Sequence, residues 1–223
     1  MTKHIGALAA VTALSVCGIG APHVSAQRAV GPAPAPGAIT GPLRLELAEG
    51  SLARYRVQEQ LAGISFPSDA AGATSAVSGT LVLGADGSVN AKESKITVDL
   101  RTLRSDQDQR DGFIRGERLL DTGKFPFAEF IPRRVVGLPS PLPAGRGAQA
   151  GFQLVGDMTI HGVTSEVTWS GIVTFNADIV AGRATTEFTF EKFGLPKPQL
   201  ARLLSVADNI NLELEFRFKR VPM

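Results

Sequence analysis

Residues 152–175 read FQLVGDMTIHGVTSEVTWSGIVTF, in which two runs of apolar and β-branched residues meet at His161-Gly162. This dipeptide predicts a two-residue hairpin turn, because glycine readily accepts a positive φ angle. Pairing the residues outward from the turn sets Leu154 opposite Trp169 and separates an apolar face from a polar one. The stretch therefore predicts an antiparallel hairpin with one buried side and one solvated side.

The same alternation recurs along the chain and predicts further short strands. The most regular run is 211–219, where Leu214 and Phe216 share one face and Glu213 and Arg217 share the other. Other strands are predicted at 43–47, 53–61, 79–83, 88–91, 95–101, 127–136 and 183–191.

Proline and glycine mark the expected breaks between these strands. Residues 63–77 are predicted to be a mobile loop and 137–151 a surface loop, while Pro132 within 127–136 predicts an edge or a bulge. The period changes at 105–120, which predicts a short helix, and Pro198 could begin a second one that runs to 206.

These elements make the chain all-β, with at most one or two short helices. So little helix cannot cover the apolar face of an antiparallel sheet, so the sheet must close as a barrel or pair as a sandwich. The residues alone leave both architectures open.

The N-terminal segment predicts export. Lys3 and His4 precede an apolar run, and Val24-Ser25-Ala26 supplies small residues before a cut at Gln27, so 1–26 reads as a cleaved signal peptide. Residues 27–42 are rich in Pro, Ala and Gly and predict a linker, and 43–221 predict one domain. We therefore expect a periplasmic or secreted protein without a stable membrane span.

The single cysteine, Cys17, lies inside this signal. The residues before it are similar to a lipoprotein box, although Val16 stands where a small residue is usual, so lipidation of Cys17 remains an alternative to cleavage after Ala26. Cleavage would leave no cysteine, and therefore no disulfide and no thiolate chemistry.

Composition argues against several functions. The chain carries 23 Lys+Arg and 21 Asp+Glu, without a basic run interleaved with aromatics, which argues against a nucleic-acid partner. A zinc site of His and Cys ligands is excluded once the signal is removed, and the G-x-S-x-G pattern is absent. We expect no cofactor, metal or catalytic residue, although an enzyme using His161 and Asp157 stays open as a weaker alternative to a turn histidine and a solvated carboxylate.

Charged residues alternate along the predicted helix, among them Arg110 and Arg115. Their ordinary role would be ion pairing on a solvated helix face. Alternatively, an arginine at the mouth of a cavity would bind a polar or phosphorylated head group. The twelve phenylalanines mostly face the predicted interior, where they either pack a solid core or leave room for one ligand.

The chain resembles the YceI-like family of secreted bacterial proteins in an ordered set of segments. These are SGTLVLGADGSV at 78–89, SKITVDLRTLRSD at 94–106, QRDGFIRGERLLDTGKFPFAEFIP at 109–132, LVGDMTIHGVTSEVTW at 154–169, FEKFGLP at 190–196 and INLELEFRF at 210–218. The resemblance implies a single lipocalin-like antiparallel β-barrel, with the short helix beside its mouth and a lumen for polyisoprenoids, isoprenoid quinones or related lipids. It defines no catalytic residue.

On this basis we expect a protein that binds or carries an apolar isoprenoid or fatty-acyl lipid inside its barrel, with Arg110 and Arg115 as head-group candidates. The residues expected to line the lumen are Val98, Leu100, Phe113, Leu154, Met158, Trp169, Phe188, Phe190, Leu214 and Phe216. The alternative is a packed stress or interaction barrel that binds another envelope protein through 63–76 or 137–151. A homodimer is left open.

The sequence departs from the family pattern near its start. Many members carry a histidine in the first strand, where this chain has Gln58 and Glu59, and the segment 64–76 is a further departure. Both positions are expected to reshape the mouth of the barrel.

Overall fold

The structure, a computed structural model, describes residues 38–39, 41–144 and 147–223. The signal peptide predicted for 1–26, with Cys17, lies outside the described residues, as does most of the linker at 27–42. In the described residues the chain is mostly β-strand, with one short α-helix and two 3-10 turns. The elements are β1 (Leu43–Leu47), β2 (Leu52–Leu61), β3 (Ser68–Thr74), β4 (Val77–Leu83), β5 (Lys95–Asp99), η1 (Leu100–Thr102), β6 (Arg104–Ser105), α1 (Asp108–Arg115), β7 (Phe127–Val136), β8 (Ala148–Ile160), β9 (Val163–Phe175), β10 (Ile179–Thr189), η2 (Phe190–Phe193) and β11 (Leu203–Val221).

The hairpin of β8 and β9 forms in the predicted register. Ile160 pairs with Val163 across the turn, and Leu154 pairs with Trp169. His161 and Gly162 have φ angles of 52° and 76°, which is the geometry of a two-residue hairpin turn with positive φ at both central positions. The parity of the side chains therefore follows the sequence prediction along the whole hairpin.

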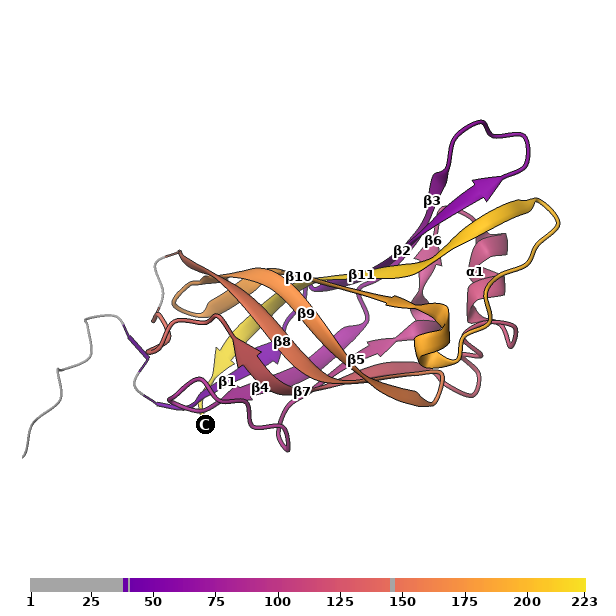
Figure 1. Cartoon of the computed structure of the whole chain (residues 1–223). Helices are drawn as coiled ribbons and strands as arrows, with labels where there is room; N and C mark the ends of the chain where they lie inside the picture. The colour runs from indigo at the N-terminus through magenta and orange to yellow at the C-terminus, as the bar shows by residue number, and fades with distance from the viewer. Residues whose placement is uncertain (1–37, 40, 145–146) are drawn as a thin grey trace, which may run out of the picture. The chain divides into compact units, whose positions relative to one another are not determined.

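The sheet closes on itself as an antiparallel barrel with eight strand positions (Figure 1). Pairing runs from β1 through β4, β5, β7, β8, β9 and β10 to β11, and β11 pairs back onto β1. In a closed ring each strand has a neighbour on both sides, and the apolar face of the sheet is turned inward. An all-β chain with this little helix can bury its apolar face in this way. The barrel predicted by the family resemblance is therefore confirmed, and the sandwich is not formed.

Three neighbouring strand positions are each divided into two pieces. β2 pairs with β11 and with β3, and β3 pairs with β6, so these three pieces continue β1, β4 and β5 toward one end of the barrel. Hydroxyl groups satisfy the backbone at these breaks. The buried hydroxyl of Ser51 donates to the carbonyl of Ala48 and accepts from the amide of Arg217, while Thr74 accepts from the amide of Ala76. The breaks let this part of the sheet diverge from the ring, as Figure 1 shows at the end where α1 lies.

At the other end of the barrel, Leu142 in the connection between β7 and β8 packs into the core. Leu142 in this connection is 3% exposed and belongs to the same core cluster as Phe175 and Phe218. The guanidinium of Arg220 donates to the carbonyls of Pro143 and Ala144. The prediction of a surface loop over 137–151 is thus wrong in part, because Leu142 packs inward and β8 already begins at Ala148.

Three other local predictions are also wrong: those for 63–77, for 88–91 and for the second helix. Residues 63–77 contain β3, whose inward positions Ala70, Gly72 and Thr74 are buried but too small to give a hydrophobic signal. Residues 88–91 form only an isolated bridge between Leu83 and Val89.

The second predicted helix is absent from the described residues, since β11 begins at Leu203 and pairs with Leu61. Strand pairing with β2 overrides the local proline signal in this segment. The first predicted helix forms but is shorter than 105–120, since it ends at Arg115 with Gly116 as its C-cap. Pro132 lies at a bulge in β7, as predicted.

Candidate functional site: the barrel cavity

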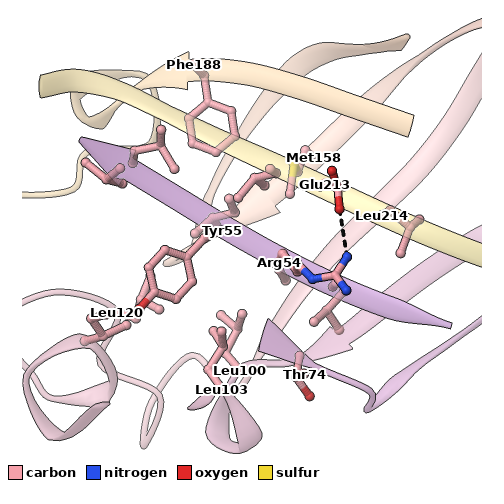
Figure 2. A pocket seen from close by; sticks show the side chains of 18 of the residues that line it. Arg54, Tyr55, Thr74, Leu100, Leu103, Leu120, Met158, Phe188, Glu213 and Leu214 are labelled. Atoms are coloured by element: carbon pink, nitrogen blue, oxygen red, sulfur yellow. Dashed lines mark hydrogen bonds and ion pairs between the residues drawn. The ribbon is translucent and has the colours of Figure 1, made fainter. Parts of the chain in front are cut away.

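The inward faces of the strands enclose a cavity of about 1190 Å³. Apolar side chains from β1 to β5 and from β7 to β11 form its wall, and residues of α1, η1 and η2 lie around its mouth. Figure 2 shows Leu100, Met158, Phe188 and Leu214 among the side chains directed toward this space. The phenylalanine-rich interior therefore does not fill the barrel.

The cavity wall contains every residue that the sequence predicts as lumen lining. These are Val98 of β5, Leu100 of η1, Phe113 of α1, Leu154 and Met158 of β8, Trp169 of β9, Phe188 of β10, Phe190 of η2, and Leu214 and Phe216 of β11. Contact between these side chains and a ligand stays a prediction. Strand parity identified nine of them, because consecutive residues of a strand point to opposite sides of a barrel wall, whereas Phe113 was predicted on the apolar stripe of the helix.

Sequence reasoning did not single out Tyr55, the only tyrosine of the chain. It lies on β2 and lines the cavity, with its ring over Gly72 of β3, where an added Cβ would stand 2.5 Å from a ring carbon. Burial raises the pKa of Tyr55 to about 12, so the phenol is neutral at physiological pH. The sequence did not indicate Tyr55 as a site residue because β3, the strand that pairs with β2 beside it, was predicted to be a loop.

Two buried polar atoms on the cavity wall have no hydrogen-bond partner within the described residues. They are the hydroxyl of Tyr55 and the indole Nε1 of Trp169. An unsatisfied buried donor costs about 1–3 kcal/mol, so such atoms usually have a partner that is water or a ligand. In the described part of the chain these two atoms are therefore hydrogen-bonding groups left free in a mostly apolar wall, whereas the lining charges Arg54 and Glu213 are paired with each other.

Arg110, one of the two predicted head-group candidates, lies at the cavity mouth. Its guanidinium approaches Glu59 of β2 to 3.0 Å and also pairs with Asp106, and its side chain is 15% exposed. Glu59, one of the positions that departs from the family pattern, also lines the cavity. The arginine charge is thus already opposed by two carboxylates.

Arg115, the other candidate, is not among the residues that line the cavity. Its guanidinium donates to the carbonyls of Arg101 and Leu103, and it therefore satisfies the backbone at the break between β5 and β6. A head-group contact for Arg115 remains a prediction.

Asp111 of α1 joins the helix to this same break. Its carboxylate is 3% exposed and accepts a hydrogen bond from the amide of Ser105 at 2.7 Å. Burial acts to raise the pKa of Asp111, but the hydrogen bonds from Ser105, together with Arg115 and Arg104, outweigh it and hold the pKa below its ordinary value. Asp111 therefore helps to hold α1 beside the mouth.

The residues of the weaker enzymatic alternative lie away from the cavity. His161 forms the turn and packs edge-on against Phe125, with ring centroids 4.7 Å apart. Asp157 faces Glu166 across the hairpin, as the register predicts, and forms an ion pair with Arg133. Within 38–39, 41–144 and 147–223, no group of three His, Cys, Asp or Glu side chains is placed to hold a metal ion. None of the described helices is long and apolar enough to span a bilayer.

Relatives of known sequence cover part of the chain. A UPF0312 protein of Pseudomonas putida strain W619 is 31% identical over 121 residues, covering 50% of this chain and 57% of that protein. Another, from Vibrio vulnificus strain YJ016, is 34% identical over 80 residues, covering 36% of this chain and 38% of that protein. The chain thus spans little more than half the length of the first relative and less than half of the second.

Solved structures share the barrel. A polyisoprenoid-binding domain from Saccharophagus degradans, implicated in plant cell wall breakdown, superposes with a TM-score of 0.60 at 13% identity, covering 80% of this chain and 98% of that domain. BcnA of Burkholderia cenocepacia superposes with a TM-score of 0.57 at 18% identity, covering 77% of this chain and 98% of BcnA. At such identities the likeness shows the fold alone. A family model described as the YceI-like domain matches residues 50–218, most of the chain, so the chain belongs to the YceI-like family.

Proposed function

We propose that this protein is a periplasmic or secreted lipid-binding protein and not an enzyme. Its barrel shelters the long apolar chain of a lipid. The observation that supports this most directly is the cavity of about 1190 Å³ with its apolar wall. Pockets for drug-sized ligands measure about 300–1,000 Å³, so this one has room for a larger molecule. A relative of the same fold is described as a polyisoprenoid-binding domain, which is consistent with such a ligand.

Burial of the lipid's apolar chain in the lumen supplies the binding free energy. Each CH₂ group moved from water into the apolar lumen contributes about 0.8 kcal/mol, so affinity grows with the length of the acyl or prenyl chain. A protein that carries such a lipid through water needs an enclosed lumen, because an open groove would leave part of the chain hydrated.

The polar atoms of the site favour a neutral lipid that carries oxygen acceptors. The indole N–H of Trp169 can only donate, and the phenol of Tyr55 can donate or accept. A diphosphate at Arg110 would meet the carboxylates of Glu59 and Asp106, which repel it. An isoprenoid quinone or an acyl ester matches these groups better than a prenyl diphosphate does.

Native mass spectrometry of protein from the envelope of its own host, followed by organic extraction, tests the proposal. We expect a bound isoprenoid or acyl lipid at near-unit occupancy. A ligand-free mass, together with no uptake of added quinone or prenyl lipid, would contradict it and favour an interaction barrel that binds through its loops.

A pair of adjacent substitutions on β10 tests whether the lipid lies in the lumen. Ala184 is buried and lines the cavity, whereas Thr185 points outward. Ala184→Phe should lower lipid occupancy severalfold, and Thr185→Phe should leave it unchanged. Equal occupancy in both variants would place the lipid elsewhere.

A further inference from the structure

Four large apolar side chains are exposed at the end of the barrel where α1 lies. Ile64 is 49% exposed, Phe66 78%, Leu200 46% and Leu204 67%. Ile64 and Phe66 belong to the loop between β2 and β3, and the two leucines lie at or just before the start of β11. We call these four residues the rim patch.

The two segments that carry the rim patch adjoin each other. Leu61 pairs with Leu203, and the amide of Ala62 donates to the carbonyl of Arg202 at 2.8 Å. Figure 1 shows the indigo β2–β3 loop next to the yellow segment that leads into β11. Leu204 is the extra residue of a bulge in β11, since Leu203 pairs with Leu61 and Ser205 with Gln60.

The rim patch is continuous with the wall of the cavity. Ile64 and Leu200 line the cavity and are also exposed to solvent, whereas Phe66 and Leu204 lie outside it. Apolar surface therefore extends from the lumen to the outside of the barrel at this rim. A single exposed apolar residue is ordinary on a protein surface, but such a cluster indicates an interaction site.

Two cations beside the rim patch are unpaired within the described residues. Across residues 38–39, 41–144 and 147–223, neither Lys197 nor Arg202 forms an ion pair. The two acidic residues of the β2–β3 hairpin are each in an ion pair, Glu59 with Arg110, which it shares with Asp106, and Asp69 with Arg56. Exposed apolar side chains flanked by unpaired cations match a bilayer interface, where acyl chains lie beneath anionic head groups.

We propose that the rim patch inserts into the surface of a bilayer that contains anionic lipids, with the mouth of the cavity against the acyl chains. This goes beyond the proposed lipid binding and rests on it, because the lipid would then pass between membrane and lumen without crossing water. Insertion to a depth of about 5–10 Å is sufficient for side chains on loop tips to reach the acyl boundary.

Vesicle co-sedimentation tests the proposal on the protein with its lumen intact. The probes are phosphatidylcholine vesicles with and without phosphatidylglycerol. Substituting Phe66→Ser or Leu204→Ser should weaken partitioning by about tenfold each. Lys197→Gln and Arg202→Gln should each cost about fivefold, and only on the anionic vesicles at low salt. The matched control is Ile172→Ser on the outer face of β9, where Ile172 is 60% exposed.

A second measurement separates membrane docking from ligand binding. Uptake of a soluble short-chain quinone, followed by the fluorescence of Trp169 without vesicles, should be unchanged in Phe66→Ser and Leu204→Ser. Transfer of a long-chain lipid from vesicles should slow in these variants and not in Ile172→Ser.

The outcomes are distinct. Absence of vesicle binding by the unaltered protein, or binding that survives Phe66→Ser with Leu204→Ser, overturns the proposal. Loss of a concentration-dependent dimer in these variants, without vesicle binding, assigns the rim patch to a second copy of the chain and also overturns it. Vesicle binding by a protein whose lumen takes up no lipid would support the docking surface and contradict the proposed function instead.

Discussion

The β8–β9 hairpin and the β2–β3 hairpin both form part of the barrel wall, but their inward side chains differ in size. β8 and β9 are joined by two residues and carry large inward side chains such as Leu154 and Trp169. β3 offers only small inward side chains, and its loop exposes Phe66 to solvent. The first hairpin packs the barrel, whereas the second depends on its neighbours for its structure and leaves apolar surface free at the mouth.

The largest expected contrast is in the free energy of unfolding. Phe175 at the end of β9 is 2% exposed, and Phe175→Ala should destabilise the protein by about 3–5 kcal/mol because it removes a large buried side chain from the wall of the lumen. Phe66→Ala should change stability by no more than about 0.5 kcal/mol. Urea unfolding measures both, and similar losses would show that the β2–β3 loop is part of the core.

A glycine pair gives the next largest effect. A Cβ at Gly72 would stand 2.5 Å from the ring of Tyr55 and 2.8 Å from the carbonyl of Arg104, so Gly72→Ala should destabilise by about 1–3 kcal/mol. At Gly151 of β8 the nearest atom is 4.0 Å away, and Gly151→Ala should be neutral or slightly stabilising. Equal effects in thermal unfolding would mean that Tyr55 moves aside without cost.

The attachment of α1 at the mouth should weaken in acid. The pKa of Asp111 is lowered in the folded protein, so its contribution is present above the unfolded pKa and is lost as pH falls through the lower folded value. Asp111→Asn should remove this pH dependence and cost about 1 kcal/mol at neutral pH. Hydrogen exchange of the Ser105 amide against pH measures it, and an unchanged acid profile in the variant would contradict the role.

No loss of stability is expected from removing the hydroxyl of Tyr55. Its hydroxyl has no partner within the described residues, so Tyr55→Phe should leave stability unchanged or raise it by up to about 1 kcal/mol. Binding of a quinone, followed by Trp169 fluorescence, should weaken by about fivefold, whereas binding of a prenyl hydrocarbon should not change. Equal affinities for both ligands would show that the phenol does not bind the ligand.

Much of the wall could be predicted because its signal is local. Residues 211–219 and most of 152–175 follow a two-residue period, and the ten predicted lining residues all lie on the cavity wall. Tyr55 and the rim patch could not be predicted as a site, since their roles depend on β3 and on the start of β11. β3 consists mostly of small residues, and the segment before β11 contains proline. Neither shows a comparable alternation of apolar and polar residues.

By itself, the sequence determined which side of each long strand is apolar and where the His161-Gly162 turn falls, because alternation and turn chemistry act between near neighbours. Tertiary structure decided that Ser68–Thr74 is a strand, that Leu142 packs into the core at one end, and that the barrel retains a cavity of about 1190 Å³. Those features arise from ring closure, which pairs backbones whatever their side chains and sets how far apart the inward faces stand.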